Sequence, residues 1–244
     1  MLTHIRSADR ITATGNKASV SDDIPHAAND TSAPAETPVA ASTDLIQIKT
    51  DVLDLAIDPQ GGDVAQLKLP LYPRRQDHPD VPFQLFDNGN ERTYLAQSGL
   101  TGVDGPDARP SGRPVFSTEK KTYELAPGQD QLVVDLKFSE NGINYIKRFT
   151  LKRGLYDVQV SYLIDNESGK PWNGNLFAQL KRDASSDPSS STATGTATYL
   201  GAALWTSSEP YKKVSMKDMD KAQLKETVTG GWVAWLQHYF VTAW

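Results

Sequence analysis

The sequence contains no cysteine, and its 244 residues include only four histidines. Without cysteine, a disulfide framework, a thiolate metal site and a cysteine nucleophile are all excluded. The four histidines do not have the spacing of metal ligands, so we predict no metal site. The chain also lacks the run of about 18 apolar residues that a membrane-spanning helix requires.

No strong excess of charge of either sign is present. The 25 basic and 30 acidic residues give a formal net charge of −5. No stretch concentrates lysine and arginine in the way that nucleic-acid-binding surfaces do, so we exclude nucleic acid as a partner. Carboxylates next to turns are common in surface loops, and no serine-nucleophile motif is present, so we predict no catalytic and no cofactor-binding residues.

The first part of the chain differs in composition from the rest. Residues 1–44 are rich in small and polar side chains and proline, and they have few large apolar groups. Such a segment buries too little apolar surface to offset the entropy lost on ordering, which predicts a disordered linker. Residues 45–244 are then expected to form one β-sandwich domain. Because the sequence stops at Trp244, directly after an apolar aromatic segment, we expect this domain to be truncated at its C-terminus.

From residue 45 onward, short runs of β-branched and aromatic residues alternate with turn residues. Apolar and polar side chains alternate on both sides of the Gly61-Gly62 turn, which predicts a hairpin over residues 53–69. In the last of three further runs, Tyr156, Val158, Val160, Tyr162 and Ile164 are expected on one buried face. Short loops between these runs favour an antiparallel meander, at residues 132–138, 143–151 and 156–165. The predicted fold class is all-β, an antiparallel β-sandwich with at most one or two short helices.

Three further segments have distinctive compositions. Residues 97–107 are rich in glycine but lack the ligand pattern of a calcium loop, so we interpret them as a long loop with consecutive turns. Residues 183–198 are polar and of low complexity, which is typical of a mobile surface loop. Residues 215–225 are the one segment expected to form a polar helix.

The most unusual segment is the last, residues 230–244, which holds three of the five tryptophans. As a helix it would carry an aromatic stripe able to contact a partner or a membrane surface. As a strand it would be apolar on both faces, like a strand inside a sandwich. Both possibilities stay open at this stage, and core packing is the favoured role. The residues that could form a partner or ligand surface are Trp172, Trp205, Trp232, Trp235, Tyr239 and Phe240.

Several stretches together resemble the large periplasmic domain of the Gram-negative YidC membrane protein insertases. They occur in the order of that family and cover most of the chain from residue 45, namely residues 50–64, 82–85, 97–107, 149–154 and 230–244. None of them is diagnostic alone, whereas five in order are fairly specific. The later strands, the membrane helices and the helical bundle of the family are missing from the sequence, and residues 183–198 match the family poorly.

The resemblance implies a β-supersandwich, similar in shape to galactose mutarotases, that is incomplete at its C-terminus. It implies a location on the periplasmic face of the inner membrane, to which helices absent from this sequence would tether the domain. It also implies partners, namely the SecD–SecF accessory complex and the Sec translocon.

Two functions therefore compete. The first is a non-catalytic periplasmic domain that supports membrane protein insertion and folding. The second is a carbohydrate-binding or mutarotase-like protein, since the implied fold also binds sugars and a fold does not fix a function. Exposed aromatic residues such as Trp172 and Trp205 would bind the sugar in the second case. Mutarotase-like catalysis would need a general acid and a general base in one cleft, and neither His78 nor His238 lies in a recognisable motif.

Overall fold

A computed structural model describes residues 2–5, 11–14, 44–89, 92–188 and 199–244. These residues divide into two compact units, one containing residues 2–5 and 44–181, the other residues 11–14 and 182–244. Strands β1 (Leu2–Ile5) and β2 (Ile11–Thr14) lie within the segment predicted as a linker. Most of that segment is outside the described residues, so the linker and the single domain over 45–244 stay predictions.

The first unit contains a four-stranded and a seven-stranded sheet. The smaller sheet has the order β1-β11-β10-β9, with β9 (Gln131–Glu140), β10 (Ile143–Lys152) and β11 (Val158–Asn166). Each of its neighbouring strand pairs is antiparallel. Asn141 and Gly142 connect β9 to β10, and both have positive φ, as a two-residue type I′ hairpin turn requires. The predicted meander is confirmed.

The larger sheet has the order β12-β7-β6-β5-β4-β3-β8. Its strands are β3 (Ile46–Lys49), β4 (Asp54–Asp58), β5 (Asp63–Arg75), β6 (His78–Asn88), β7 (Thr93–Thr101), β8 (Thr122–Glu124) and β12 (Asn175–Arg182). The β3–β8 pair is parallel, whereas the pairs from β3 to β7 along the sheet are antiparallel. The β4–β5 pair confirms the predicted hairpin, and Gly61 and Gly62 form its turn with φ of 75° and 66°.

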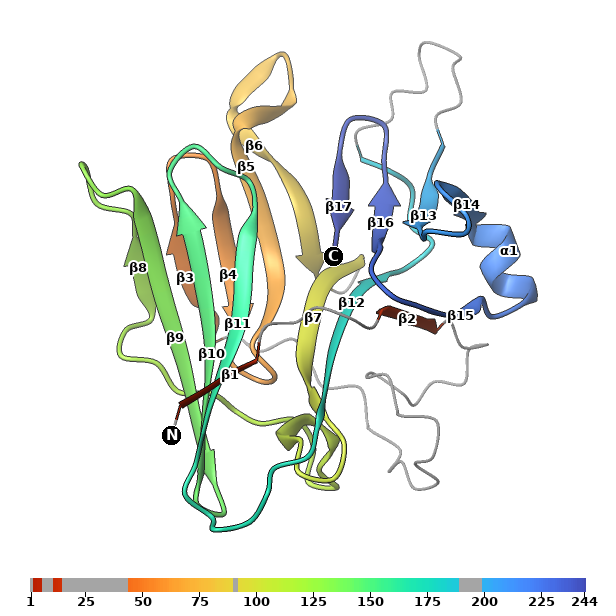
Figure 1. Ribbon diagram of the computed structural model, residues 1–244. Coiled ribbons are helices and arrows are strands. Elements are labelled where there is room, and N and C mark those ends of the chain that lie inside the picture. The colour runs from red at the N-terminus through yellow and green to blue at the C-terminus, as the bar shows by residue number, and fades with distance from the viewer. Residues whose placement is uncertain (1, 6–10, 15–43, 90–91, 189–198) are drawn as a thin grey trace. The chain divides into compact units, whose positions relative to one another are not determined.

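The two sheets lie face to face (Figure 1) and enclose the core of the first unit. One cluster shows this directly, because it joins Leu100 of β7 to Ile143 and Tyr145 of β10 and to Tyr162 and Ile164 of β11. Each apolar side chain fully buried in this way contributes roughly 1.5–3 kcal/mol to folding. The unit is therefore a β-sandwich, as predicted.

Two sequence predictions in this unit are wrong. Tyr156 is exposed and precedes β11, because the β10–β11 turn is longer than the alternating pattern suggested. Residues 97–101 are the buried end of β7 and not part of a loop, and only residues 102–107 form turns and the short 3-10 helix η1 (Pro106–Ala108). Gly99 argued against a strand in the sequence, because glycine has a low strand propensity. In the structure a residue without Cβ is required at this position, because Asp107 and Phe177 pack against it.

The second unit contains a four-stranded sheet, a two-stranded sheet and one helix. The larger sheet has the order β14-β13-β16-β17, and the smaller pairs β15 with β2. The elements are β13 (Gly201–Trp205), β14 (Lys212–Ser215), α1 (Met216–Lys221), β15 (Lys225–Val228), β16 (Trp232–Leu236) and β17 (Val241–Ala243). Residues 230–244 thus form strands and not a helix, which settles the alternative that the sequence left open.

The predicted helix is present but ends earlier than expected. Ser215 caps its N-terminus through a reciprocal capping box with Asp218. The chain becomes extended at Ala222, and Lys225 already belongs to β15. No helix in the described part of the chain is long and apolar enough to cross a membrane.

Residues 183–198 were predicted to be a mobile surface loop. In the described portion, Asp187 is buried and accepts hydrogen bonds from Gln237 Nε2 at 3.1 Å and from the His238 backbone N–H at 2.8 Å. The start of this segment is therefore fixed to the β16–β17 turn and is not a free surface loop. The prediction for residues 189–198 lies outside the described residues.

Candidate functional site

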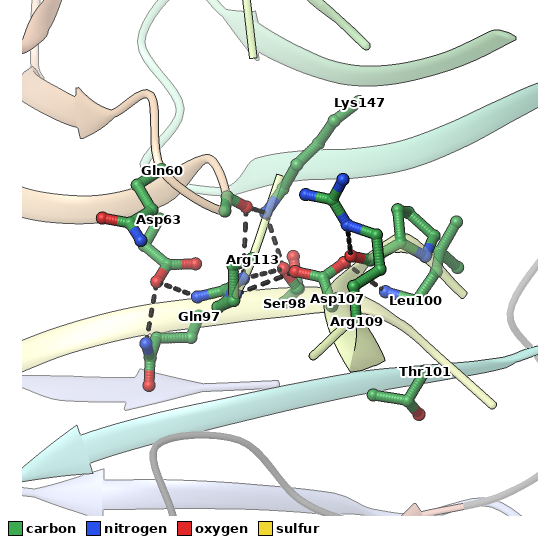
Figure 2. A network of polar contacts seen from close by, with 12 residues as sticks. Gln60, Asp63, Gln97, Ser98, Leu100, Thr101, Asp107, Arg109, Arg113 and Lys147 are labelled. Carbon is green, nitrogen blue, oxygen red and sulfur yellow. Dashed lines mark hydrogen bonds and ion pairs between the residues drawn. The ribbon is translucent and has the colours of Figure 1, made fainter. Parts of the chain in front are cut away.

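A cluster of buried charged and polar side chains lies between the two sheets of the first unit (Figure 2). We call it the buried network. It collects side chains from β5, β7 and β10 and from the segment after β7, namely Asp63, Gln97, Ser98, Asp107, Arg113 and Lys147.

Arg113 is the centre of the buried network. Its guanidinium pairs with Asp63 through Nη1 and donates to Asp107 Oδ1 through Nε at 2.8 Å. Its Nη2 donates to the carbonyl oxygens of Gly61 at 3.2 Å and of Ser98 at 3.1 Å. Burial alone would lower the pKa of Arg113, but the two carboxylates outweigh that effect and raise it. Arg113 therefore stays charged.

Lys147 is bound to the same two carbonyl oxygens as Arg113. Its Nζ donates to Gly61 O at 2.9 Å and to Ser98 O at 2.8 Å. Burial lowers the pKa of Lys147 to about 8, and the nearby Arg113 charge acts in the same direction, while Asp63 and Asp107 oppose it. Lys147 thus links β10 to the β4–β5 turn and to β7, on the opposite sheet.

The carboxylates have further partners within the unit. Asp107 Oδ2 accepts the backbone N–H of Leu100 at 2.8 Å. Asp63 Oδ2 accepts Gln97 Nε2 at 2.7 Å, and Gln97 Oε1 in turn accepts Gln179 Nε2 at 2.6 Å. Asp63 Oδ1 is buried and has no hydrogen-bond partner. The network therefore reaches from β10 on one sheet to β12 at the edge of the other.

The charges of the buried network sum to zero, with two cations and two carboxylates, and all four side chains are buried. Buried ion pairs stabilise a fold only where their geometry and further hydrogen bonds offset the cost of removing the charges from water. Within the described residues, no three histidine or acidic side chains are grouped so that they could hold a metal ion. We therefore interpret the buried network as a clamp between the sheets.

Sequence reasoning did not find this network, although one signal was available. In β10 the buried positions alternate, and Lys147 occupies one of them between Tyr145 and Phe149. A lysine at a core-facing position of a strand requires buried hydrogen-bond acceptors. Which acceptors these are depends on residues far away in the sequence, such as Gly61.

The six residues predicted as a partner or ligand surface fall into both units. Trp172 belongs to the first unit, where it packs against the cluster around Leu100. Its indole Nε1 donates to Asp104 O and to Tyr145 OH, each at 3.1 Å. Trp172 is therefore not the exposed platform that a sugar site would need.

The other five predicted residues belong to the second unit. Trp235 is only 8% exposed and its ring lies 6.0 Å from the Arg182 guanidinium, so it is a core residue and not a surface residue. Tyr239 is 72% exposed and its ring contacts that of His238, with 4.0 Å between centroids. Phe240 is half-buried in the β16–β17 turn. These three residues belong to the second unit, whereas Trp172 belongs to the first.

Trp205 and Trp232 are brought together. They are direct partners in the β13–β16 ladder, and both line a small apolar hollow of the second unit. We call this the aromatic hollow, and its lining is Leu204, Trp205, Thr206, Leu224, Glu226, Val228, Trp232 and Val233. Within the predicted set, Trp205 and Trp232 are the two residues that line one hollow together.

The sequence matches the family described as "YidC periplasmic domain" over residues 45–244. The chain belongs to this family. Three Pseudomonas proteins named "Membrane protein insertase YidC" are similar to it. From P. fluorescens, the Pf0-1 protein is 85% identical over 233 residues and the SBW25 protein 81% over 233 residues. The protein of P. syringae pv. syringae B728a is 75% identical over 236 residues.

These alignments cover 96% of the chain but only 42% of each relative. The family match confirms the resemblance and identifies the chain as a periplasmic domain. The carbohydrate-binding alternative is not favoured, since these relatives are named as insertases.

Proposed function

We propose that this chain is a non-catalytic scaffold on the periplasmic face of the inner membrane, within an insertase that inserts and folds membrane proteins. The observation that carries the proposal is the family match over residues 45–244. The buried network adds a physical argument. Its four charged side chains are used to hold two sheets together, and groups with that role are not free to act as a general acid or base.

The two histidines whose side chains the structure describes, His78 and His238, support the same conclusion. His78 lies on the exposed end of the β5–β6 hairpin, 3.9 Å from Asp77. His238 lies in the β16–β17 turn, where its ring contacts Tyr239. Neither belongs to the buried network, so the acids of that network have no histidine partner for mutarotase-like proton transfer.

The partners of the domain are part of the proposal. The family resemblance implies the SecD–SecF complex and the Sec translocon, and the relatives' name implies a membrane protein as the client. A sandwich with a rigid core suits this role, because it presents fixed surfaces to several partners without needing a reactive group.

A graft experiment tests the proposal. Residues 45–244 replace the matching segment of the P. fluorescens Pf0-1 insertase in cells depleted of their own copy. We expect normal insertion of a reporter membrane protein and co-purification of SecD–SecF with the graft. Lys147→Met, which removes the buried amine, should leave insertion unchanged. Loss of insertion by a Lys147→Met graft that is folded and present at normal levels would contradict a non-catalytic role. If SecD–SecF does not co-purify with the graft, this complex is not a partner of the domain.

A further inference from the structure

Five large apolar side chains are exposed at one end of the first unit. Leu71, Tyr72 and Val81 belong to the β5–β6 hairpin, and Leu155 and Tyr156 belong to the β10–β11 turn. The rings of Tyr72 and Tyr156 are in edge contact, with 6.0 Å between their centroids, so the two segments form one surface. Figure 1 shows the hairpin and the turn at the same end of the unit. We call these five residues the tip patch.

The β5–β6 hairpin projects from its sheet. Every residue from 70 to 81 is exposed, although the two strands stay paired there, for example at Arg75 and His78. Both faces of this arm are therefore exposed, and the arm presents a tip and not the concave groove that encloses a peptide or a sugar. Apolar side chains gathered on such a tip indicate an interaction, because soluble proteins rarely leave large apolar groups together in water.

Prolines make this arm suitable for an apolar environment. Four of the 13 residues 70–82 are proline. Proline has no backbone N–H, so fewer donors have to lose their water when the arm leaves solvent. The fixed φ of proline also limits the entropy that is lost when the arm is held against a surface.

The charge around the tip patch is balanced, whereas the chain as a whole has a net charge of −5. Residues 70–82 and 152–157 together hold four lysine and arginine side chains and three aspartates, and Asp51, which accepts a backbone N–H of the second segment, brings the sum to zero. Arg74 and Lys152 form no ion pair with any described residue. Tyrosines, aliphatic groups and unpaired cations together are the side chains that proteins place at the boundary between water and lipid.

We propose that the tip patch binds the surface of a phospholipid bilayer, with its apolar side chains at the boundary between headgroups and acyl chains. Arg74 and Lys152 then meet the lipid phosphates. The choice of a membrane over a protein partner rests on the proposed function, which places this domain beside the inner membrane. On that function a weak affinity is sufficient, because tethering gives the lipid surface a millimolar effective concentration.

Flotation of the 244-residue chain with lipid vesicles tests the proposal. The vesicles contain phosphatidylethanolamine and phosphatidylglycerol in a three-to-one ratio, and we expect half of the protein to float at millimolar lipid. Leu71→Ser/Leu155→Ser removes one aliphatic group from each segment and should lower the partition coefficient at least about tenfold. Val103→Ser/Val115→Ser, at two valines of the same unit that are 95% and 65% exposed, is the matched control and should leave it unchanged. All four positions are exposed, so neither double variant should change the melting temperature.

A second pair of substitutions isolates the contribution of charge. Arg74→Gln/Lys152→Gln should weaken binding to the vesicles with phosphatidylglycerol at least about fivefold, because each cation beside an anionic bilayer is attracted to it. Binding to vesicles of phosphatidylcholine, which has no net charge, should change less than about twofold. Equal losses with both lipids would contradict the assignment of these two cations to lipid phosphates in an anionic surface.

Failure of the unchanged chain to float at millimolar lipid would overturn the proposal. Undiminished flotation of Leu71→Ser/Leu155→Ser would also overturn it, by assigning the lipid contact to another segment. Flotation does not depend on insertion activity. A graft that inserts proteins normally while the chain fails to float contradicts the membrane contact alone, whereas flotation with a failed graft contradicts the proposed function alone.

Discussion

Arg113 and Lys147 share the carbonyl oxygens of Gly61 and Ser98, yet they should contribute very differently to stability. Arg113 pairs directly with both carboxylates of the buried network. Lys147 has hydrogen bonds only to carbonyl oxygens, and its lowered pKa shows that burial disfavours its charge. The charge of Arg113 is therefore required to neutralise the two carboxylates, whereas burying the charge of Lys147 costs free energy on folding.

A pair of methionine substitutions tests this difference at the residue scale. Arg113→Met leaves Asp63 and Asp107 buried without their direct partner, and we expect it to lower the free energy of unfolding by about 3–5 kcal/mol. Lys147→Met keeps the volume and leaves both carbonyl oxygens bonded to Arg113, so we expect a change of less than about 1.5 kcal/mol. Urea unfolding followed by circular dichroism measures both. Equal losses would show that the two cations have the same role.

At the scale of elements, turns with left-handed residues determine how neighbouring strands are connected. Gly61 and Gly154 have nearly the same φ, 75° and 71°. A Cβ at Gly61 would lie 2.2 Å from Arg113 Cζ, whereas a Cβ at Gly154 would have no neighbour within 4 Å. The β4–β5 turn is thus part of the clamp between the sheets, whereas the β10–β11 turn has room for a side chain at Gly154.

This contrast predicts two different outcomes for the same substitution. Gly154→Ala should cost about 1–2 kcal/mol, the penalty for a left-handed alanine. Gly61→Ala adds displacement of Arg113 to that penalty, and we expect a loss of more than about 3 kcal/mol. In an Arg113→Met background the extra cost of Gly61→Ala should disappear, which a double-mutant cycle measures. A similar cost in both backgrounds would mean that Arg113 is not displaced.

At the scale of the whole molecule, the buried network should make stability depend on pH in the alkaline range. The pKa of Lys147 is lowered from 10.5 to about 8. Between these values the unfolded chain binds more protons than the folded chain, so the free energy of unfolding rises with pH, by at most about 3 kcal/mol. Burial raises the pKa of Tyr162 well above 10, so that group lowers stability as the pH rises beyond 10.

We therefore expect a stability maximum between the lysine and tyrosine transitions, near the upper end of the pH 8–10 interval. Urea unfolding at half-unit steps from pH 7 to pH 11 measures it. In Lys147→Met the rise above pH 8 should be absent while the loss above pH 10 stays. A rise that persists in the variant would assign the effect to another group.

The sequence by itself determined the local pattern of this protein. Alternating apolar residues and short turns were sufficient to predict the hairpin before Leu69 and the β9–β11 meander, because strand period and turn chemistry are properties of neighbouring residues. Five short stretches in order also identified the family.

Only the tertiary structure decided which residues meet between the two sheets. Arg113 meets Asp63 fifty positions away, and Lys147 meets Gly61 across 86 positions. No local pattern encodes such pairs, since they depend on how two sheets stack. The same reason explains why residues 230–244 form strands, why Trp172 is partly buried and Trp235 fully buried, and why Trp205 and Trp232 share the aromatic hollow.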